Sequence, residues 1–171
     1  MADLRYIYWD ANPFCAVFNK EKDRLDKCVA VLNAAEAGEL KIITSSNTLA
    51  EVVRVKGEPR IGPGQEAILY DFFQNDFIIF VNVEWFVGTQ ARRLIHDFPA
   101  LKPMDAIHLA TALRAKVAEM HTYDDDLCHL SGKVGVPPLS IRTPSLEAPE
   151  LPLAEHRIIG GEPHSIELEL E

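Results

Sequence analysis

The feature of this sequence that most restricts its fold is a regular alternation of short apolar segments with longer amphipathic ones. The short segments are rich in β-branched and aromatic residues, which is typical of buried strands, and the longer ones repeat apolar residues at helical spacing. Strands separated by helices predict a parallel sheet that is covered by helices on both faces. The predicted strands are Arg5–Trp9, Leu40–Thr44, Phe77–Val83, Met120–Tyr123 and Pro138–Arg142, and the predicted helices are Lys22–Ala37, Asn47–Lys56, Gln65–Gln74, Val87–Asp97 and Pro103–Glu119.

Length and charge together predict one domain followed by a tail. A chain of 171 residues suits a single domain, and after Thr143 the composition shifts to Pro, Glu and Leu. We therefore expect a domain over residues 1–144 and an acidic tail over 145–171, in which the alternating residues 166–170 fit a late edge strand. The tail has seven Glu and one Arg, so it carries −6 of the formal net charge of −9 and the domain is only mildly acidic.

The termini and the cysteines indicate the compartment. The first ten residues lack the basic and apolar regions of a secretory signal, and the longest apolar stretch, 77–83, is far shorter than the ~20 residues that span a bilayer. The three cysteines form no CxxC pair, which favours reduced thiols over a zinc site. We expect a cytoplasmic protein with no membrane partner.

Four acidic residues stand out because of their positions relative to the predicted elements. Asp10 follows the first strand directly, and Asp124 follows the fourth. Glu51 and Asp105 lie near the starts of two predicted helices. In an open α/β sheet the strand ends and the helix starts meet at one edge, where ligands bind. We therefore expect these four carboxylates to lie in one crevice.

Carboxylates gathered in one crevice repel one another and need a compensating positive charge. Hard divalent cations such as Mg²⁺ or Mn²⁺ prefer oxygen ligands and would supply it. Asp126 adds a further acid to the same loop. Sites with one or two such ions are a standard device for phosphoryl chemistry, so the pattern predicts metal-dependent phosphoryl chemistry.

Each acid also has a purely structural interpretation. Thr48 to Glu51 reads as a capping box, and Asp105 would stabilise the positive end of a helix dipole. Asp10 next to Asn12-Pro13 fits a turn, and Asp124 fits the N-cap of a short helix. The four structural interpretations are independent of one another, whereas a shared site explains all four positions at once.

At these residues the sequence resembles the PIN-domain ribonucleases of the VapC-like toxin type. The resemblance covers Tyr6 to about Arg142. It rests on the segments DAN at 10–12, TLAEVV at 48–53, DAIHLATA at 105–112 and TYDDDL at 122–127, in that order. The last two segments, downstream of the other acids, are the more specific part of the pattern. The loop at 56–64 and the acidic tail depart from the compact toxins.

The resemblance implies a three-layer α/β/α sandwich with a central, mostly parallel sheet. It also implies a ribonuclease dependent on Mg²⁺ or Mn²⁺, an RNA substrate, a cognate antitoxin and a homodimer. The catalytic and metal-binding acids would be Asp10, Glu51, Asp105 and Asp124. Asp126 matches a supporting metal-binding acid, and Asn12 and Thr122 match polar supports of the site.

Three further predictions concern the neighbourhood of the acids. Arg54, three positions after Glu51, is our candidate for contacting a substrate phosphate. His108 lies three positions after Asp105, which suits a second ligand, but its apolar neighbours favour a packed and hydrogen-bonded histidine. Trp9, Phe14 and Phe18 read as core or interface residues and not as platforms for bases.

Two other classes of protein remain to be weighed against a nuclease. A haloacid-dehalogenase-like phosphatase would need a second Asp two residues after Asp10, where this sequence has Asn12. A non-catalytic PIN-like module that acts through a protein partner fits the acidic balance and the tail. Stabilisation by Mn²⁺ separates the module from the nuclease, because a ligand of the folded state raises the melting temperature.

Overall fold

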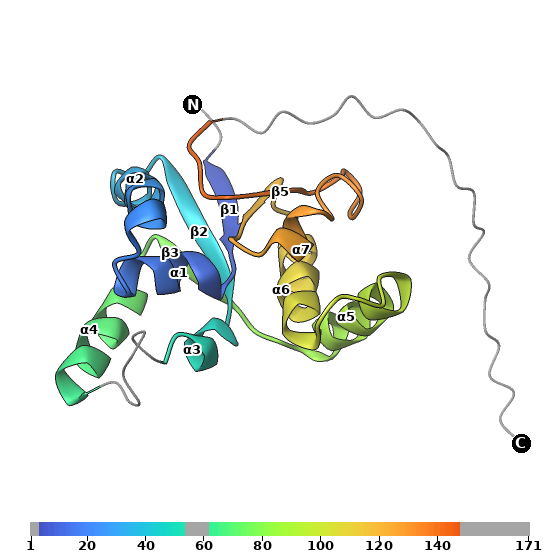
Figure 1. Cartoon of the computed structure of the whole chain (residues 1–171), viewed down its shortest axis with the longest axis horizontal. Coiled ribbons are helices and arrows are strands. Elements are labelled where there is room, and N and C mark those ends of the chain that lie inside the picture. Colours follow the sequence, from blue (N-terminus) through green and yellow to red (C-terminus); the bar gives the residue numbers. More distant parts are fainter. Residues whose placement is uncertain (1–3, 54–61, 148–171) are drawn as a thin grey trace, which may run out of the picture.

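The protein is built around a five-stranded sheet in which every strand is parallel to its neighbours and the order is β3-β2-β1-β4-β5. The computed structural model describes residues 4–53 and 62–147 (Figure 1). The elements are β1 Arg5–Trp9, α1 Ala11–Phe18, α2 Lys22–Glu36, β2 Leu40–Ser45, α3 Thr48–Glu51, α4 Pro63–Phe73, β3 Ile78–Val81, α5 Trp85–Asp97, α6 Pro103–Arg114, β4 Glu119–His121, α7 Asp125–Cys128 and β5 Ser140–Arg142.

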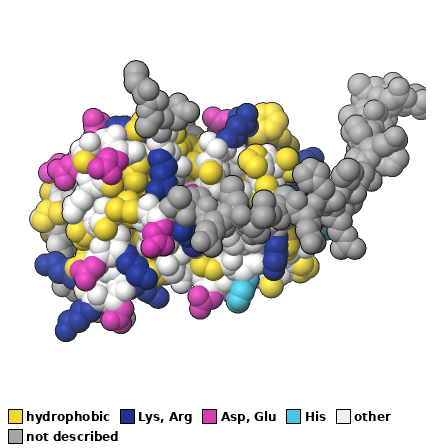
Figure 2. Space-filling view, turned by 90° about the horizontal axis from the view of Figure 1, so that it is seen from above, with side chains coloured by type: hydrophobic (Ala, Val, Ile, Leu, Met, Phe, Trp, Pro, Cys, Tyr) yellow, Lys and Arg dark blue, Asp and Glu magenta, His cyan; other side chains and the backbone are white. Residues whose placement is uncertain are grey.

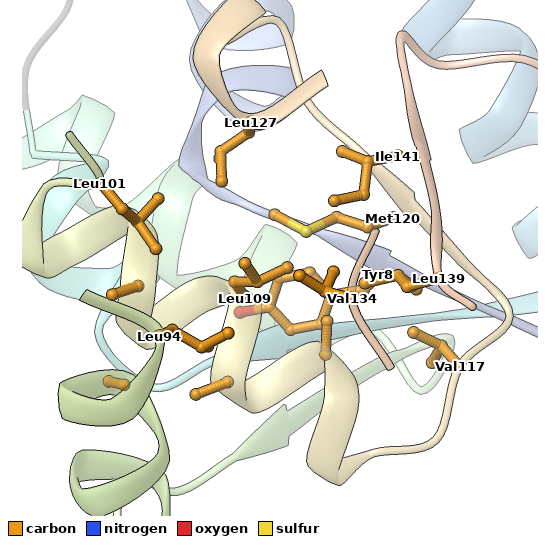
Figure 3. Close-up of a cluster of buried hydrophobic side chains, with 14 of the residues drawn as sticks. Tyr8, Leu94, Leu101, Leu109, Val117, Met120, Leu127, Val134, Leu139 and Ile141 are labelled. Atoms are coloured by element: carbon orange, nitrogen blue, oxygen red, sulfur yellow. The ribbon is translucent and has the colours of Figure 1, made fainter. Parts of the chain in front are cut away.

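The central strand β1 shows how the sheet buries both faces. Side chains alternate along a strand, so Ile7 and Trp9 point to one face and Tyr8 to the other. Ile7 and Trp9 pack with residues of α1, α2 and α4, and Tyr8 packs with residues of α5 and α6. Figure 1 shows these two groups of helices on opposite sides of the sheet, and Figure 3 shows the Tyr8 cluster. The predicted three-layer α/β/α sandwich is confirmed.

The first helix is the main element that the sequence pattern left out. The Asn12-Pro13 pair suggested a turn, but α1 begins at Ala11 and Asp10 is its N-cap. Proline in the first turn of a helix costs nothing, because the amide it lacks would have no partner there. Phe14 is fully buried and contacts the rings of Trp9 and Phe73. Of the three aromatic residues predicted to lie in the core or an interface, Trp9 and Phe14 are fully buried in the core, and Phe18 is partly buried against it.

The helix predicted over Asn47–Lys56 ends already at Glu51 in α3, and an error of the same size concerns α6. Its predicted end was Glu119, but the helix ends at Arg114 and Glu119 already belongs to β4. Lys116 takes a positive φ of 54°, a left-handed conformation that ends a helix. Glu119 then pairs with Ile7 in the sheet. The spacing of apolar residues over 115–117 continues the helical pattern, so the sequence does not indicate that the helix ends before Lys116.

On the face seen in Figure 2, acidic and basic side chains are interspersed over the described surface. Among the residues that the structure describes, no helix is long and apolar enough to cross a bilayer. Two sequence predictions lie outside the described residues, namely the phosphate contact of Arg54 and the late strand at 166–170. Residues 145–147, at the start of the predicted tail, lie against the domain.

Candidate metal-binding acidic site

Asp10 is a buried carboxylate at the carboxyl end of the central strand. Only 2% of the residue is exposed. Its Oδ1 accepts a hydrogen bond from the Asn12 amide at 3.0 Å, and its Oδ2 accepts from Asn12 Nδ2 at 3.2 Å and from the Thr122 hydroxyl at 2.5 Å. Burial raises the pKa of Asp10 to about 6, because the bonds from Thr122 and Asn12 and the nearby His108 only partly offset the loss of water.

Thr122 connects Asp10 to the second strand-end acid. It follows β4, the neighbour of β1, and is fully buried. Its hydroxyl donates to Asp10 and accepts from the Asp124 amide at 2.9 Å. Asp124 is the N-cap of α7, and its Oδ1 accepts from the amides of Asp126 at 2.8 Å and Leu127 at 3.2 Å. One threonine hydroxyl thus contacts both the carboxylate of Asp10 and the backbone amide of Asp124.

Glu51 is the last residue of the one-turn helix α3, and its partner is a histidine. Its Oε2 lies 2.6 Å from His108 Nε2, and His108 Nδ1 lies 2.8 Å from the Tyr8 hydroxyl. The N-cap of α3 is Asn47, with no side-chain capping bond, so the capping-box interpretation of Glu51 is wrong. His108 is 2% exposed, which agrees with a packed, hydrogen-bonded histidine.

Asp105 lies half-buried in the first turn of α6, one turn before His108. Burial raises the pKa of Asp105, and the charge of Asp124 raises it further, while Lys102 and His108 lower it. Glu51 also raises the pKa of Asp105. The charges of Asp124 and Glu51 thus both act against ionisation of Asp105.

Asp126, the further acid after β4, has a mostly exposed side chain. Asp126 Oδ2 lies 4.0 Å from Lys102 Nζ, and both side chains are mostly exposed. Asn12 is exposed and serves as a donor to Asp10. The sequence reading missed Lys102 and Tyr8, since neither belongs to an acid-containing motif. Lys102 could have been noticed as the residue that precedes the Pro103 helix start.

The chemistry of the donor set fits a hard divalent cation. Carboxylate oxygens are its preferred ligands, and no Lys or Arg of residues 4–53 and 62–147 forms an ion pair with Asp10, Asp105 or Asp124. As the side chains stand, no three Asp, Glu, His or Cys residues within those ranges converge closely enough to hold an ion. Glu51 is turned toward His108.

Two hollows lie away from these acids. One, of about 520 Å³, lies between α2 and residues 142–147. The other, of about 500 Å³, lies between α3 and α4 and is lined mainly by apolar side chains, including Leu69 and Phe73. Asp10, Glu51, Asp105 and Asp124 line neither of these two hollows.

Comparison with known proteins places this arrangement in a family. The PIN domain family model matches residues 7–133, and the chain belongs to the PIN domain family. The four acids and Thr122 all lie within the matched range. No curated protein matches the sequence.

Solved structures share the fold at low sequence identity. VapC20 of Mycobacterium tuberculosis, a toxin that cleaves the sarcin-ricin loop, is 17% identical, with a TM-score of 0.56 over 71% of this chain and 92% of its own. FitAcB from Neisseria gonorrhoeae is 15% identical, with a TM-score of 0.54 over 81% of this chain and 97% of its own. A toxin-antitoxin complex from Klebsiella pneumoniae contains a chain that is 20% identical, with a TM-score of 0.52 over 81% of this chain and 97% of its own.

Proposed function

We propose that this protein is a divalent-metal-dependent ribonuclease that hydrolyses RNA phosphodiester bonds as the toxin of a toxin-antitoxin pair. The observation that carries the proposal is that Thr122 links the buried Asp10 carboxylate to Asp124, while neither acid has a Lys or Arg ion-pair partner among the described residues. Membership of the PIN domain family and the shared fold with a toxin that cleaves RNA support it.

Asp10, Glu51, Asp105 and Asp124 are the residues that would hold Mg²⁺ or Mn²⁺, with Asp126 in support. When bound, the cation supplies activation of a water molecule and compensation of the charge that develops on the phosphoryl oxygens. The chain contributes the positioning. Thr122 fixes Asp10 relative to Asp124 by donating to one and accepting from the backbone of the other.

Substrate and partners follow from the same proposal. Single-stranded or structured RNA would lie over the acidic edge, and the exposed Lys102, 4.0 Å from Asp126, is the described cation placed to contact its phosphates. A cognate antitoxin and a homodimer complete the proposed assembly, in the cytoplasm. A small protein encoded beside this gene that binds the chain and suppresses cleavage would identify the antitoxin.

The test compares RNA cleavage and metal binding in the full chain and in Asp105→Asn. We expect the wild type to cleave RNA in the presence of Mn²⁺. The cleavage rate of the variant should be lower by at least about 100-fold, because one of the carboxylates that would hold the cation is gone. Mn²⁺ at about 100 times its dissociation constant should stabilise the wild type by about 2.7 kcal/mol and the variant by much less.

The matched control is Asp76→Asn, which removes one carboxylate from the surface, where its side chain is 96% exposed. It should cleave and bind Mn²⁺ like the wild type. A wild type that is neither stabilised by Mn²⁺ nor active on RNA would instead favour the non-catalytic module that acts through a protein partner.

A further inference from the structure

The side chain of Glu51 is held by a residue from a different layer of the molecule. Glu51 ends a helix of four residues, and 28% of its side chain is exposed. Its partner His108 comes from the middle of α6, where only 3% of the side chain is exposed. The two residues are 57 positions apart in sequence, so their 2.6 Å contact joins α3 to α6 across the end of the sheet.

The hydrogen-bond pattern fixes which atom carries the proton between them. An ionised carboxylate can only accept, so His108 Nε2 bears the hydrogen that points to Glu51. The other ring nitrogen, Nδ1, faces the Tyr8 hydroxyl at 2.8 Å. Both ring nitrogens of His108 therefore have a hydrogen-bond partner, Glu51 at Nε2 and the Tyr8 hydroxyl at Nδ1.

Tyr8 and His108 are held by packing as well as by their hydrogen bonds. Tyr8 is fully buried on the central strand, and its ring meets the imidazole edge-on with the centroids 6.0 Å apart. Figure 3 shows Tyr8 inside the cluster that α6 forms with the sheet, close to Leu109. The imidazole therefore presents Nε2 in one direction.

We propose that His108, oriented by Tyr8, is the positioning residue that holds the Glu51 carboxylate at the acidic edge before a cation arrives. This inference rests on the proposed metal-dependent function and assigns a task to two residues outside the acidic set. A free glutamate side chain loses about 1.5–2 kcal/mol of conformational entropy when it is fixed. His108 removes part of that loss from the binding step, because Glu51 is already ordered at the edge.

The experiment measures Mn²⁺ affinity by titration calorimetry at one fixed pH for the full chain. His108→Leu places an apolar side chain of moderate size there and removes the donor, and we expect it to weaken Mn²⁺ binding about 10-fold, the lower end for loss of a ligand's supporting partner. His108→Gln, whose amide nitrogen can reach the place of Nε2, should recover most of that loss. Tyr8→Phe removes only the hydroxyl and should weaken binding less than His108→Leu does.

Measuring His108→Leu in the Glu51→Gln variant distinguishes a positioning role of His108 from a purely structural one. If His108 acts through Glu51, adding His108→Leu to Glu51→Gln should not weaken Mn²⁺ binding further. His96→Leu is the matched control, since its imidazole on α5 is 90% exposed, and its affinity should be that of the wild type. Should His108→Leu fail to fold, Tyr8→Phe and His108→Gln carry the same comparison.

The outcomes are distinct. Wild-type affinity in His108→Leu and Tyr8→Phe, or an equal loss with and without Glu51, overturns the positioning role and leaves the proposed function standing. A wild type that does not bind Mn²⁺ overturns the proposed function and this inference with it. Loss in His108→Leu, recovery in His108→Gln and no added loss in Glu51→Gln support the positioning role.

Discussion

Two buried carboxylates, at opposite ends of the neighbouring strands β1 and β4, differ in the charge of their hydrogen-bond partners. Glu119 begins β4, is 1% exposed and forms ion pairs with Arg5 and Arg142 and a 2.8 Å hydrogen bond with His121. Asp10 follows β1, is 2% exposed and receives bonds from Thr122 and Asn12, which are uncharged.

The pKa values of these two groups have moved in opposite directions for that reason. Burial alone would raise the pKa of Glu119, but the bonds from His121, Arg5 and Arg142 outweigh it and lower the pKa to about 2. The neutral donors around Asp10 do not outweigh burial, and its pKa rises to about 6. Glu119 thus has its countercharge built into the chain, whereas Asp10 is left short of positive charge, which a bound cation would provide.

A chain of hydrogen bonds joins the two regions. Trp9, the residue before Asp10, donates from Nε1 to His121 Nδ1 at 3.0 Å, and His121 Nε2 faces Glu119 at 2.8 Å. Because Nδ1 accepts, the hydrogen of the imidazole lies on Nε2 and is donated to Glu119. The fixed charges at one end of the strands therefore help to hold the backbone from which Asp10 extends at the other.

Removal of Glu119 should have the largest effect on stability. Glu119→Ala leaves two guanidinium groups without their shared acceptor, and we expect the free energy of unfolding to fall by about 3 kcal/mol, the lower end for a broken buried pair, since both arginines are partly exposed. Urea denaturation at neutral pH measures it. Glu21→Ala, which breaks the surface pair with Arg24, should cost under about 1 kcal/mol. Equal losses would mean that burial does not distinguish the two pairs.

The second prediction uses the pH dependence of Asp10 in metal-free protein. An acid whose pKa is raised from 3.8 to about 6 binds protons more tightly in the folded state, so its contribution to stability falls as the pH rises through this window. Relative to Asp10→Asn, the wild type should lose about 3 kcal/mol between about pH 4 and pH 7, at 1.36 kcal/mol per pKa unit.

The comparison with Asp10→Asn cancels the other groups that titrate in the same range. Urea denaturation in the presence of a chelator gives the difference at each pH. For Glu119, whose pKa is lowered, stability should instead be lost as the pH falls from about 4.5 toward 2. A wild-type minus Asp10→Asn difference that does not change with pH would show that Asp10 is not short of positive charge.

The smallest of these effects is expected for Thr122→Val, which keeps the shape of the side chain and removes its hydroxyl. Asp10 loses a donor and the Asp124 amide loses an acceptor, so we expect a loss of about 1–2 kcal/mol in the free energy of unfolding. Mn²⁺ affinity should fall as well, because Asp10 and Asp124 are no longer tied together. Thr89→Val, on an exposed turn of α5, is the control and should change neither quantity measurably.

The sheet and the neighbourhood of the acids could be predicted from sequence because both follow from local pattern. Apolar periodicity locates β1 and β2 to within a residue, and parallel connectivity then brings the strand ends to one edge. Asp10 and Asp124 are placed by that rule alone. The roles of these acids in binding metal stay predictions.

What the sequence could not provide were the partners of buried polar groups. In the sequence, Glu119 ends a predicted helix, and no residue near it indicates that its partner is Arg5, 114 positions away. His108 could be recognised as packed, but its contact with Glu51 depends on how α3 and α6 meet. Such pairings are decided by tertiary packing, which no local pattern records.

The two arginines that bind Glu119, Arg5 and Arg142, also determine where the chain can be truncated without loss of contacts. Arg5 donates to the carbonyls of Leu146 at 3.0 Å and Glu147 at 3.1 Å, and Arg142 also donates to the Glu147 carbonyl. The two ends of the described chain are thus fastened to each other through one buried acid. A truncated protein for crystallisation should therefore keep all residues up to Glu147. Truncation at residue 144 would remove the backbone carbonyls that accept from both guanidinium groups.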